Sequence, residues 1–331
     1  MAKMTMKEIA KKAKVSQPTV SRVLNGHRGV SEEIVNAVMK VIEEVGYVPN
    51  KAAQTLKRSS TNIIGMCTRE IYNPYFVEII DSLELEARKN GYNILLHNSK
   101  YNPVTEWENI QNFVSRQVDG IIIVPSSDFN LERISKLDIP TVVITNNKKM
   151  LDSVGINHFQ AGKLAGESFI HSGHKTFGYI GSIRDDEKFY GLESVLQENG
   201  FTFDPNNFLL VESSNNNFMI RRYIEKYLDE SEKLEFTCLF AENDIMALEF
   251  MRAAQQRQIR VPEDVSIIGF DDTYLAKIME ISSIHQPIGE MVRTSFEILL
   301  NRINQEMPSS LVNIMMEPTL IERKSSKFRR R

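Results

Sequence analysis

The first 46 residues carry apolar side chains at helical spacing, in three short stretches separated by polar residues. Thr5 can cap the first stretch, and Glu8 three positions later completes a T-x-x-E capping box. Ile9, Ala10 and Ala13 then recur at the spacing of one helix face. The pattern therefore predicts a first helix that begins just after Thr5.

Two more helices are expected before residue 47. The second begins at Ser16, a good N-cap, with Pro18 in the first turn, where a missing N–H costs little. The third runs from an N-cap at Ser31 to a stop at Gly46. Their apolar faces consist of Val20, Val23 and Leu24 in the second helix and Ile34, Val35, Val38, Val41, Ile42 and Val45 in the third.

The pattern breaks at residues 49–50. Residues 50–58 are basic and weakly helical, and a helix this short is marginal in isolation. Residues 59–62 form a polar linker. We therefore expect the three-helix segment to be a separate small unit.

Beyond the linker, apolar runs that resemble strands alternate with amphipathic stretches such as 76–90, 106–117 and 161–172. Strand–helix alternation with apolar strands predicts parallel sheets covered by helices on both faces. Eight strands can form one large sheet or two smaller ones. The expected strands are 63–67, 93–97, 120–124, 141–145, 176–180, 208–211, 237–241 and 265–270.

The first two helices, joined across residues 13–15, form a helix-turn-helix pattern. In this motif the second helix enters the major groove of DNA, with its N-terminal residues at the base edges. Gln17 suits adenine and Arg22 suits guanine, and hydroxyl and basic side chains suit phosphates. A small helical bundle without DNA-binding activity is the alternative. The predicted DNA contacts are Thr5, Lys7, Ser16, Gln17, Pro18, Thr19, Ser21, Arg22, Asn25 and Arg28.

Charge is distributed unevenly along the 331 residues. Residues 1–60 carry eleven Lys and Arg against five Asp and Glu, whereas the whole chain has a net charge of −3. A basic head on an acidic body is typical of a DNA-binding module attached to another domain. Residues 323–331 hold six more basic side chains, and we expect them to be a solvated tail.

Other features narrow the class of protein. Cys67 and Cys238 stand alone in apolar runs, so we expect free thiols and no metal site or cofactor. No apolar run approaches the roughly 20 residues of a membrane span, and no signal peptide precedes the first helix, so a cytoplasmic location is expected. No P-loop, G-x-S-x-G or metal-ligand spacing appears, so we do not expect an enzyme.

The order of residues in the head carries a specific resemblance. T-M-K-E-I-A at 5–10, A-K-V-S at 13–16, T-V-S-R-V-L-N-G at 19–26 and G-Y-V-P-N at 46–50 resemble the headpiece of the lactose-repressor/galactose-repressor (LacI/GalR) family. Lys14 departs from this pattern, because the family usually has Gly in the turn. If the position requires a positive φ, Lys there costs about 1 kcal/mol.

The resemblance implies a role for residues 50–58. In the family this segment folds as a hinge helix on specific DNA, and a leucine inserts into the minor groove at the operator centre. Leu56 occupies that position, with Ala53 beside it and Asn50 at the start of the segment. Such insertion kinks the duplex and requires a second hinge helix, so the resemblance implies a homodimer on a pseudopalindromic operator.

The resemblance extends less tightly to residue 322, through N-P-Y-F at 73–76, V-D-G-I-I at 118–122 and V-P-E-D-V-S-I-I-G-F-D-D at 261–272. It implies an α/β core of two doubly wound parallel-sheet subdomains, as in periplasmic sugar-binding proteins, with a ligand between them. The expected domains are a headpiece (1–48), a hinge and linker (49–61), an N-subdomain (about 62–158 and 287–315), a C-subdomain (about 159–286 and 316–322) and the tail.

Polar residues that follow strands are the first candidates to bind this ligand. Asp271 would accept hydrogen bonds from hydroxyls or pair with an amine, and Asn243 would both donate and accept. Tyr72, Tyr75 and Phe76 could pack on an apolar sugar face. For each candidate, a helix cap, a loop hydrogen bond or core packing is the alternative. The full set is Tyr72, Tyr75, Phe76, Ser126, Thr145, Lys188, Asn217, Phe218, Asn243, Asp271 and Gln286.

Lys188 stands where the family commonly has Arg, and Lys cannot make a fork of parallel hydrogen bonds. The ligand class therefore stays open among a sugar, a sugar phosphate, a sugar acid and an amino sugar. The resemblance favours a repressor, and the absence of leucine heptads after 323 argues against a tetramer-forming coiled coil. A transport binding protein or an effector-blind DNA binder are the remaining rivals.

Overall fold

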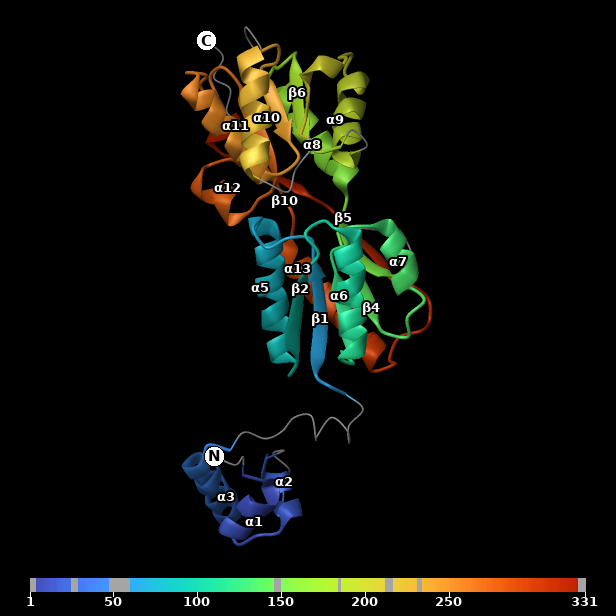
Figure 1. The fold of residues 1–331 in the computed structure, drawn as a ribbon. Helices are drawn as coiled ribbons and strands as arrows, with labels where there is room; N and C mark the ends of the chain where they lie inside the picture. The colour runs from blue at the N-terminus through green and yellow to red at the C-terminus, as the bar shows by residue number, and fades with distance from the viewer. Residues whose placement is uncertain are drawn as a thin grey trace. The chain divides into compact units, whose positions relative to one another are not determined.

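The computed structural model describes residues 4–24, 29–47, 60–145, 150–183, 186–211, 217–230 and 234–326. The chain divides into two compact units, Met1–Thr61 and Asn62–Arg331 (Figure 1). The first unit is the small helical headpiece, and the second is an α/β unit that contains two sheets.

The headpiece consists of α1 (Met6–Lys12), α2 (Gln17–Leu24) and α3 (Glu32–Val45). The predicted capping box is confirmed, because the Thr5 N–H donates to the Glu8 carboxylate at 2.7 Å and the Glu8 N–H donates to the Thr5 hydroxyl at 3.4 Å. Gly46 ends α3 in the left-handed region with a φ of 59°. Lys14 also has a positive φ, 54°, so the turn imposes the strain expected of a residue other than glycine.

The first sheet of the α/β unit is entirely parallel, in the order β11-β5-β4-β3-β1-β2. Helices α5 and α13 cover one face, while α6 and α7 cover the other. We call this sheet and its helices the first lobe. Its elements are β1 (Ile63–Thr68), α5 (Pro74–Lys89), β2 (Asn93–Asn98), α6 (Pro103–Ser115), β3 (Gly120–Ile123), α7 (Asp128–Ile134), β4 (Thr141–Ile144), β5 (Asp152–Ile156), α13 (Ile288–Ile303) and β11 (Asn313–Met316).

The second sheet, in the order β12-β10-β9-β8-β6-β7, is parallel except for β12. Helices α8 and α9 cover one face, and α10 and α11 cover the other. We call this the second lobe. Its elements are α8 (His158–His171), β6 (Phe177–Gly181), α9 (Glu187–Glu198), η1 (Pro205–Asn207), β7 (Phe208–Leu210), α10 (Asn217–Glu230), β8 (Cys238–Ala241), α11 (Asp244–Gln256), β9 (Ser266–Asp271), α12 (Tyr274–Ile278), β10 (Ser282–His285), β12 (Thr319–Ile321) and η2 (Lys324–Ser326).

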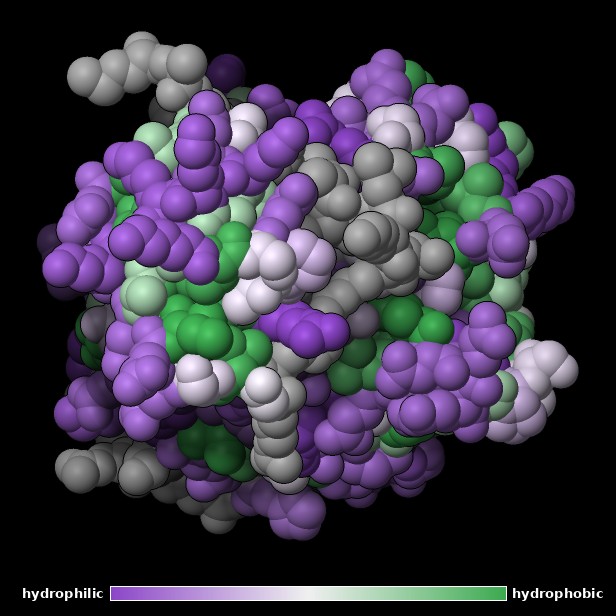
Figure 2. All heavy atoms as spheres, turned by 90° about the horizontal axis from the view of Figure 1, so that it is seen from below, coloured by the Kyte–Doolittle hydropathy of each residue, from purple (hydrophilic) through white to green (hydrophobic). Residues whose placement is uncertain are grey.

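The chain crosses between the lobes three times: from β5 to α8, from β10 to α13, and from β11 to β12 (Figure 1). The predicted fold class, a helix-turn-helix headpiece with two doubly wound subdomains, is therefore confirmed. Cys67 and Cys238 are buried free thiols, as expected. No helix in the described ranges is long and apolar enough to cross a membrane. Most of the surface facing the viewer in Figure 2 is hydrophilic, with separate apolar patches.

Two expectations need correction. The described part of the chain contains twelve strands where eight were expected, because β5, β10, β11 and β12 are short and partly polar. The solvated tail was expected to begin at Arg323. Instead, Arg323 and η2 pack on the second lobe, where the Ser325 hydroxyl donates to the Ile267 carbonyl at 2.6 Å and the Arg323 N–H donates to the Ser282 hydroxyl at 2.7 Å.

Candidate DNA-reading helix and inter-lobe ligand site

The N-terminal half of α2 presents the predicted base-reading side chains at its surface. Gln17, Pro18 and Arg22 are exposed, while Thr19 and Ser21 are half-buried. Val20 faces inward and is fully buried with Ile9 in the headpiece core. This core fixes the roll of α2, so its opposite face remains available to a DNA groove.

Two other predicted contacts already have local partners. The Ser16 hydroxyl accepts from the Thr19 N–H at 3.3 Å and lies 2.8 Å from the Thr19 hydroxyl, and Thr5 belongs to the α1 capping box. Lys7 is exposed on α1. Asn25, Arg28, Asn50, Ala53 and Leu56 lie outside the described residues.

In the α/β unit, a chain of hydrogen bonds links the lobes. Gln286 follows β10 at the second crossing, and its side-chain amide donates to Asp271 Oδ1 at 2.7 Å. The Tyr75 hydroxyl on α5 donates to Gln286 Oε1 at 3.4 Å. All three side chains are buried. The structure thus brings together three of the predicted effector contacts, from both lobes and the crossing.

The backbone at the end of β9 is strained where Asp271 points toward Gln286. Asp271 has a φ of 111° and Asp272 a φ of 52°, both in the region that favours glycine. Asp272 holds the turn, since its N–H donates to the Ser283 hydroxyl at 3.0 Å and its carboxylate accepts from Arg323 at 2.6 Å. His285 Nδ1 lies 3.0 Å from the other Asp272 oxygen.

Burial changes the acidity of this region. It raises the pKa of Asp271 well above the usual range, and the neighbouring Asp244 carboxyl adds to the effect. Burial likewise raises the pKa of Asp244 to about 6, although Asp244 accepts hydrogen bonds from Thr273 and Ser283. Both carboxyls therefore bind protons more readily than exposed aspartates do.

Lys188, at the start of α9, is buried and held within the second lobe. Its ammonium donates to the Glu242 carbonyl at 2.9 Å, lies 3.8 Å from Asp186 Oδ2, and sits 4.5 Å from the centre of the Phe270 ring. The positive charge of Lys188 lowers the pKa of Asp271, against the larger effect of burial. Lys188 therefore stays a predicted ligand contact, and its ammonium can act there only as a point charge.

Three of the other predicted contacts form hydrogen bonds within their own lobes. Asn243 caps α11 by accepting from the Met246 N–H at 2.9 Å. Ser126 lies 2.7 Å from the Ser99 hydroxyl, and its N–H donates to the Glu106 carboxylate. The Thr145 N–H donates to the Val154 carbonyl at 3.0 Å.

The aromatic candidates separate into three cases. Phe76 lies in the hydrophobic core of the first lobe, where it packs against Tyr75, whereas Tyr72 is 79% exposed. Both residues stay predicted ligand contacts. Asn217 and Phe218 begin α10, but their side chains lie outside what the structure describes.

Sequence reasoning missed several polar groups at the same strand ends. Arg69 directly follows β1, donates to the Pro125 carbonyl at 2.6 Å and lowers the pKa of His158. Glu242 directly follows β8, and both its carboxylate oxygens accept hydrogen bonds from Ser182. Asn243 and Asp271 were selected because they are polar residues that follow a strand. Arg69 and Glu242 also follow strands, so the same reasoning selects them.

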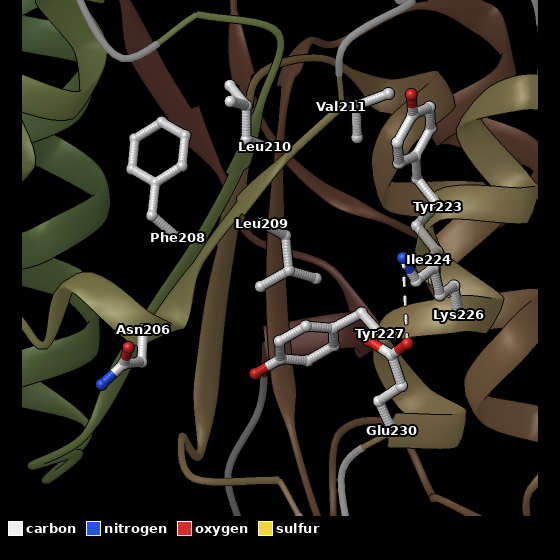
Figure 3. A pocket seen from close by; sticks show the side chains of 10 residues that line it. All are labelled: Asn206, Phe208, Leu209, Leu210, Val211, Tyr223, Ile224, Lys226, Tyr227 and Glu230. Carbon is white, nitrogen blue, oxygen red and sulfur yellow. Dashed lines mark ion pairs between the residues drawn. The ribbon is translucent and has the colours of Figure 1, made fainter.

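A separate cavity of about 200 Å³ lies between β7, at the edge of the second sheet, and α10 (Figure 3). Leu209 and Ile224 line it with apolar surface, and Lys226 and Glu230 form an ion pair of 3.8 Å beside it. Its lining includes none of the predicted effector contacts. Its lining also carries the polar side chains of Asn206, Tyr223 and Tyr227.

A helix-turn-helix headpiece on a two-lobed α/β unit defines the class of DNA-binding transcription regulators with a periplasmic-binding-protein-like domain. Residues 5–50 match the lacI family of bacterial regulatory proteins, and residues 167–326 match the periplasmic binding protein-like domain. The chain belongs to the lacI family, as its motifs predicted.

Relatives and solved structures agree with this assignment. The chain is 31% identical to the HTH-type transcriptional repressor PurR of Aliivibrio salmonicida, over 97% of this chain and 98% of the relative. It is 32% identical to catabolite control protein A of Priestia megaterium, over 94% and 96%. The lac repressor dimer bound to operator and the anti-inducer ONPF shares the fold, with a TM-score of 0.84, 22% identity and coverage of 98% and 99%. These relatives are regulators, which confirms the prediction that the protein is not an enzyme.

Proposed function

We propose that the protein is a cytoplasmic, homodimeric repressor that binds a pseudopalindromic operator and is controlled by a small molecule bound between its lobes. The hydrogen-bond chain Asp271–Gln286–Tyr75 is the observation that carries the effector part. A polar ligand that bonds to Asp271 competes with Gln286, which in turn holds Tyr75 of the first lobe. Ligand binding therefore changes a contact that links the lobes.

Exposed apolar side chains support the dimer. Val77 on α5 and Tyr274 and Ile278 on α12 are all exposed, although each is large and apolar. The two helices belong to different lobes and meet where the Tyr274 N–H donates to the Glu78 carboxylate at 2.9 Å. A subunit interface across α5 and α12 would cover these apolar side chains. A partner subunit bound across both lobes would sense their movement.

Two such subunits place two copies of α2 on successive major-groove faces, one helical turn or a multiple apart. Arg22 and Gln17 then read base edges, while Lys7 and the α2 N-terminus hold phosphates. The family resemblance adds Leu56 and Ala53 at the minor groove between the half-sites. The ligand alters DNA affinity only by its different affinity for the two lobe arrangements.

The test begins with selection of a bound duplex from a random pool by the full-length protein. Arg22→Ala should then weaken binding to that duplex by roughly 10- to 100-fold and relax the base preference at one position in each half-site. Lys40→Ala is the matched control, because Lys40 is an exposed cation on α3 outside the recognition helix. If Arg22→Ala holds the selected duplex as tightly as the parent, the proposed mode of binding is wrong.

A further inference from the structure

The cavity between β7 and α10 has an apolar floor. Leu209 and Val211 on β7 and Ile224 on α10 line it, and each of the three is no more than 6% exposed. These side chains belong to one hydrophobic core of the second lobe. The floor is therefore part of the packed lobe and does not depend on a surface loop.

Two tyrosines one turn apart on α10 form an aromatic wall of this cavity. Tyr223 and Tyr227 are half-buried and pack against the same core. In Figure 3 the Tyr227 ring extends from α10 toward Leu209, whereas the Tyr223 ring lies near Val211. Tyr227 also stacks on Phe236, with ring centroids 6.3 Å apart and an interplanar angle of 24°, which supports the ring from outside the cavity. Such a wall favours an aromatic ring over an aliphatic one, because aromatic pairs gain energy beyond their buried area.

The polar side chains of the lining carry no net charge. Lys226 and Glu230 are both exposed and lie 3.8 Å apart, so their charges offset each other. Asn206 on η1 is exposed as well, and its amide can both donate and accept a hydrogen bond. A charged ligand would lose hydration here without meeting an unpaired opposite charge. A neutral ligand with an N–H or O–H group can bond to the Asn206 amide.

The size of the cavity and the length of β7 limit what can occupy it. An apolar cavity of about 150 Å³ holds benzene, so a volume of about 200 Å³ admits one ring with a substituent or two fused rings. Among the described strands β7 pairs only with β6, which leaves its other edge open to a further strand. However, β7 has three residues, and so short an edge strand offers few main-chain partners to a peptide or to a second copy of the chain.

We propose that this cavity is a second ligand site, which binds a neutral aromatic molecule of one or two rings that carries an N–H or O–H group. The ring lies between the Leu209 floor and the Tyr223 and Tyr227 side chains, and the polar group bonds to Asn206 at the opening. The site is separate from the inter-lobe site, because its lining includes none of the predicted effector contacts.

Ligand-observed NMR titration of the full-length protein tests the ligand class. The probes are indole and benzyl alcohol, and the matched analogues of benzyl alcohol are cyclohexylmethanol, benzoate and benzylamine. We expect indole and benzyl alcohol to bind with dissociation constants below about 1 mM. Cyclohexylmethanol should bind at least about threefold more weakly than benzyl alcohol because it has no aromatic face. Benzoate and benzylamine should also bind more weakly, since each loses the hydration of its charge.

Variants then locate the bound probe. Tyr223→Leu and Tyr227→Leu each remove an aromatic ring but keep apolar bulk, so each should weaken indole binding by roughly 2- to 12-fold. Two variants are used because Tyr227→Leu also removes the contact with Phe236, and circular dichroism checks that each one folds. Phe129→Leu is the matched control and should leave indole affinity unchanged, because Phe129 is exposed on α7 of the first lobe. Asp271→Asn should also leave it unchanged, because Asp271 does not line the cavity.

Several results would overturn the proposal. If neither indole nor benzyl alcohol binds below about 1 mM, or if cyclohexylmethanol binds as tightly as benzyl alcohol, the ligand class is wrong. If both tyrosine variants bind indole as tightly as the parent, or if Asp271→Asn abolishes binding, the probe occupies another site. If Tyr223→Leu converts a larger assembly into a smaller one in sedimentation, a second copy of the chain covers the cavity instead.

Discussion

Helices α8 and α9 pack so closely that a single methyl group should disturb the ligand site. A Cβ at Gly162 on α8 would lie 1.9 Å from the Lys188 carbonyl oxygen and 2.7 Å from the Leu192 amide nitrogen, both main-chain atoms of α9. Gly191 on α9 has the reciprocal contact, 1.9 Å from the Phe159 carbonyl oxygen of α8. Main-chain atoms cannot rotate away as a side chain does, so the helices themselves must move.

The size of the effect follows from these distances. Real Cβ contacts almost never fall below 3.0 Å, so Gly162→Ala must separate the helices locally by at least about 1 Å. Overpacking of this kind costs about 3 kcal/mol, the upper end of the usual range, because both clashes involve main chain. The same shift moves Lys188, whose bond to the Glu242 carbonyl is 2.9 Å long, so effector affinity should fall by about tenfold.

Urea unfolding followed by circular dichroism measures the stability change, and calorimetry measures effector binding. Gly289→Ala is the matched control, because a Cβ there meets nothing within 4 Å in the first turn of α13. That control should be neutral or stabilising by up to about 1 kcal/mol. If Gly162→Ala unfolds within about 0.5 kcal/mol of the parent, the packing argument is refuted.

Two further predictions concern the stability of the lobes. In the first lobe, Arg302 makes a two-pronged ion pair with the buried Asp152 at 2.6 and 2.8 Å. Asp152→Ala should cost about 3 kcal/mol in urea unfolding, because the guanidinium loses its opposite charge and keeps only the Pro308 and Ser310 carbonyls as acceptors. A loss below about 1 kcal/mol would contradict this. In the second lobe, burial lowers the pKa of His174 from 6.5 to about 4. The unfolded chain therefore protonates His174 at a higher pH than the folded chain does. The free energy of unfolding is unaffected by this group above pH 6.5 and falls by up to about 3 kcal/mol as the pH drops toward 4. His174→Gln should flatten the pH dependence of unfolding over that range, and an unchanged slope would exclude His174 as its cause.

The helices of the headpiece could be predicted from the sequence because the residues that begin and end them lie close together in the chain. The Thr5–Glu8 capping box, the Gly46 stop and the turn at Lys14 each depend on a few consecutive residues. The strands could not all be predicted from local sequence. The apolar runs located β1 and β9. In contrast, β5 and β10 contain Asp152 and three serines that are buried because tertiary hydrogen bonds satisfy them.

Part of the candidate site could be predicted, because some of its polar residues directly follow strands. Asp271 follows a strand expected from the sequence, whereas Gln286 was expected at a crossing into the first lobe. The structure places their side chains 2.7 Å apart. The hydrogen-bond partners of Glu242 and Arg323 could not be predicted, because they lie 60 and 51 residues away in sequence. Phe76 stays a predicted ligand contact, and the structure places it in the first-lobe core beside Tyr75.

In the proposed mechanism, ligand binding between the lobes and DNA binding by the headpiece are coupled. The most direct measurement is the affinity of the full-length protein for its selected duplex with and without saturating ligand, together with the ligand affinity of free and DNA-bound protein. We predict that the ligand changes duplex affinity, and that the duplex changes ligand affinity, by the same factor, roughly 5- to 150-fold. A ligand that loses affinity in Asp271→Asn, and so binds at this site, yet leaves duplex affinity unchanged would contradict the account.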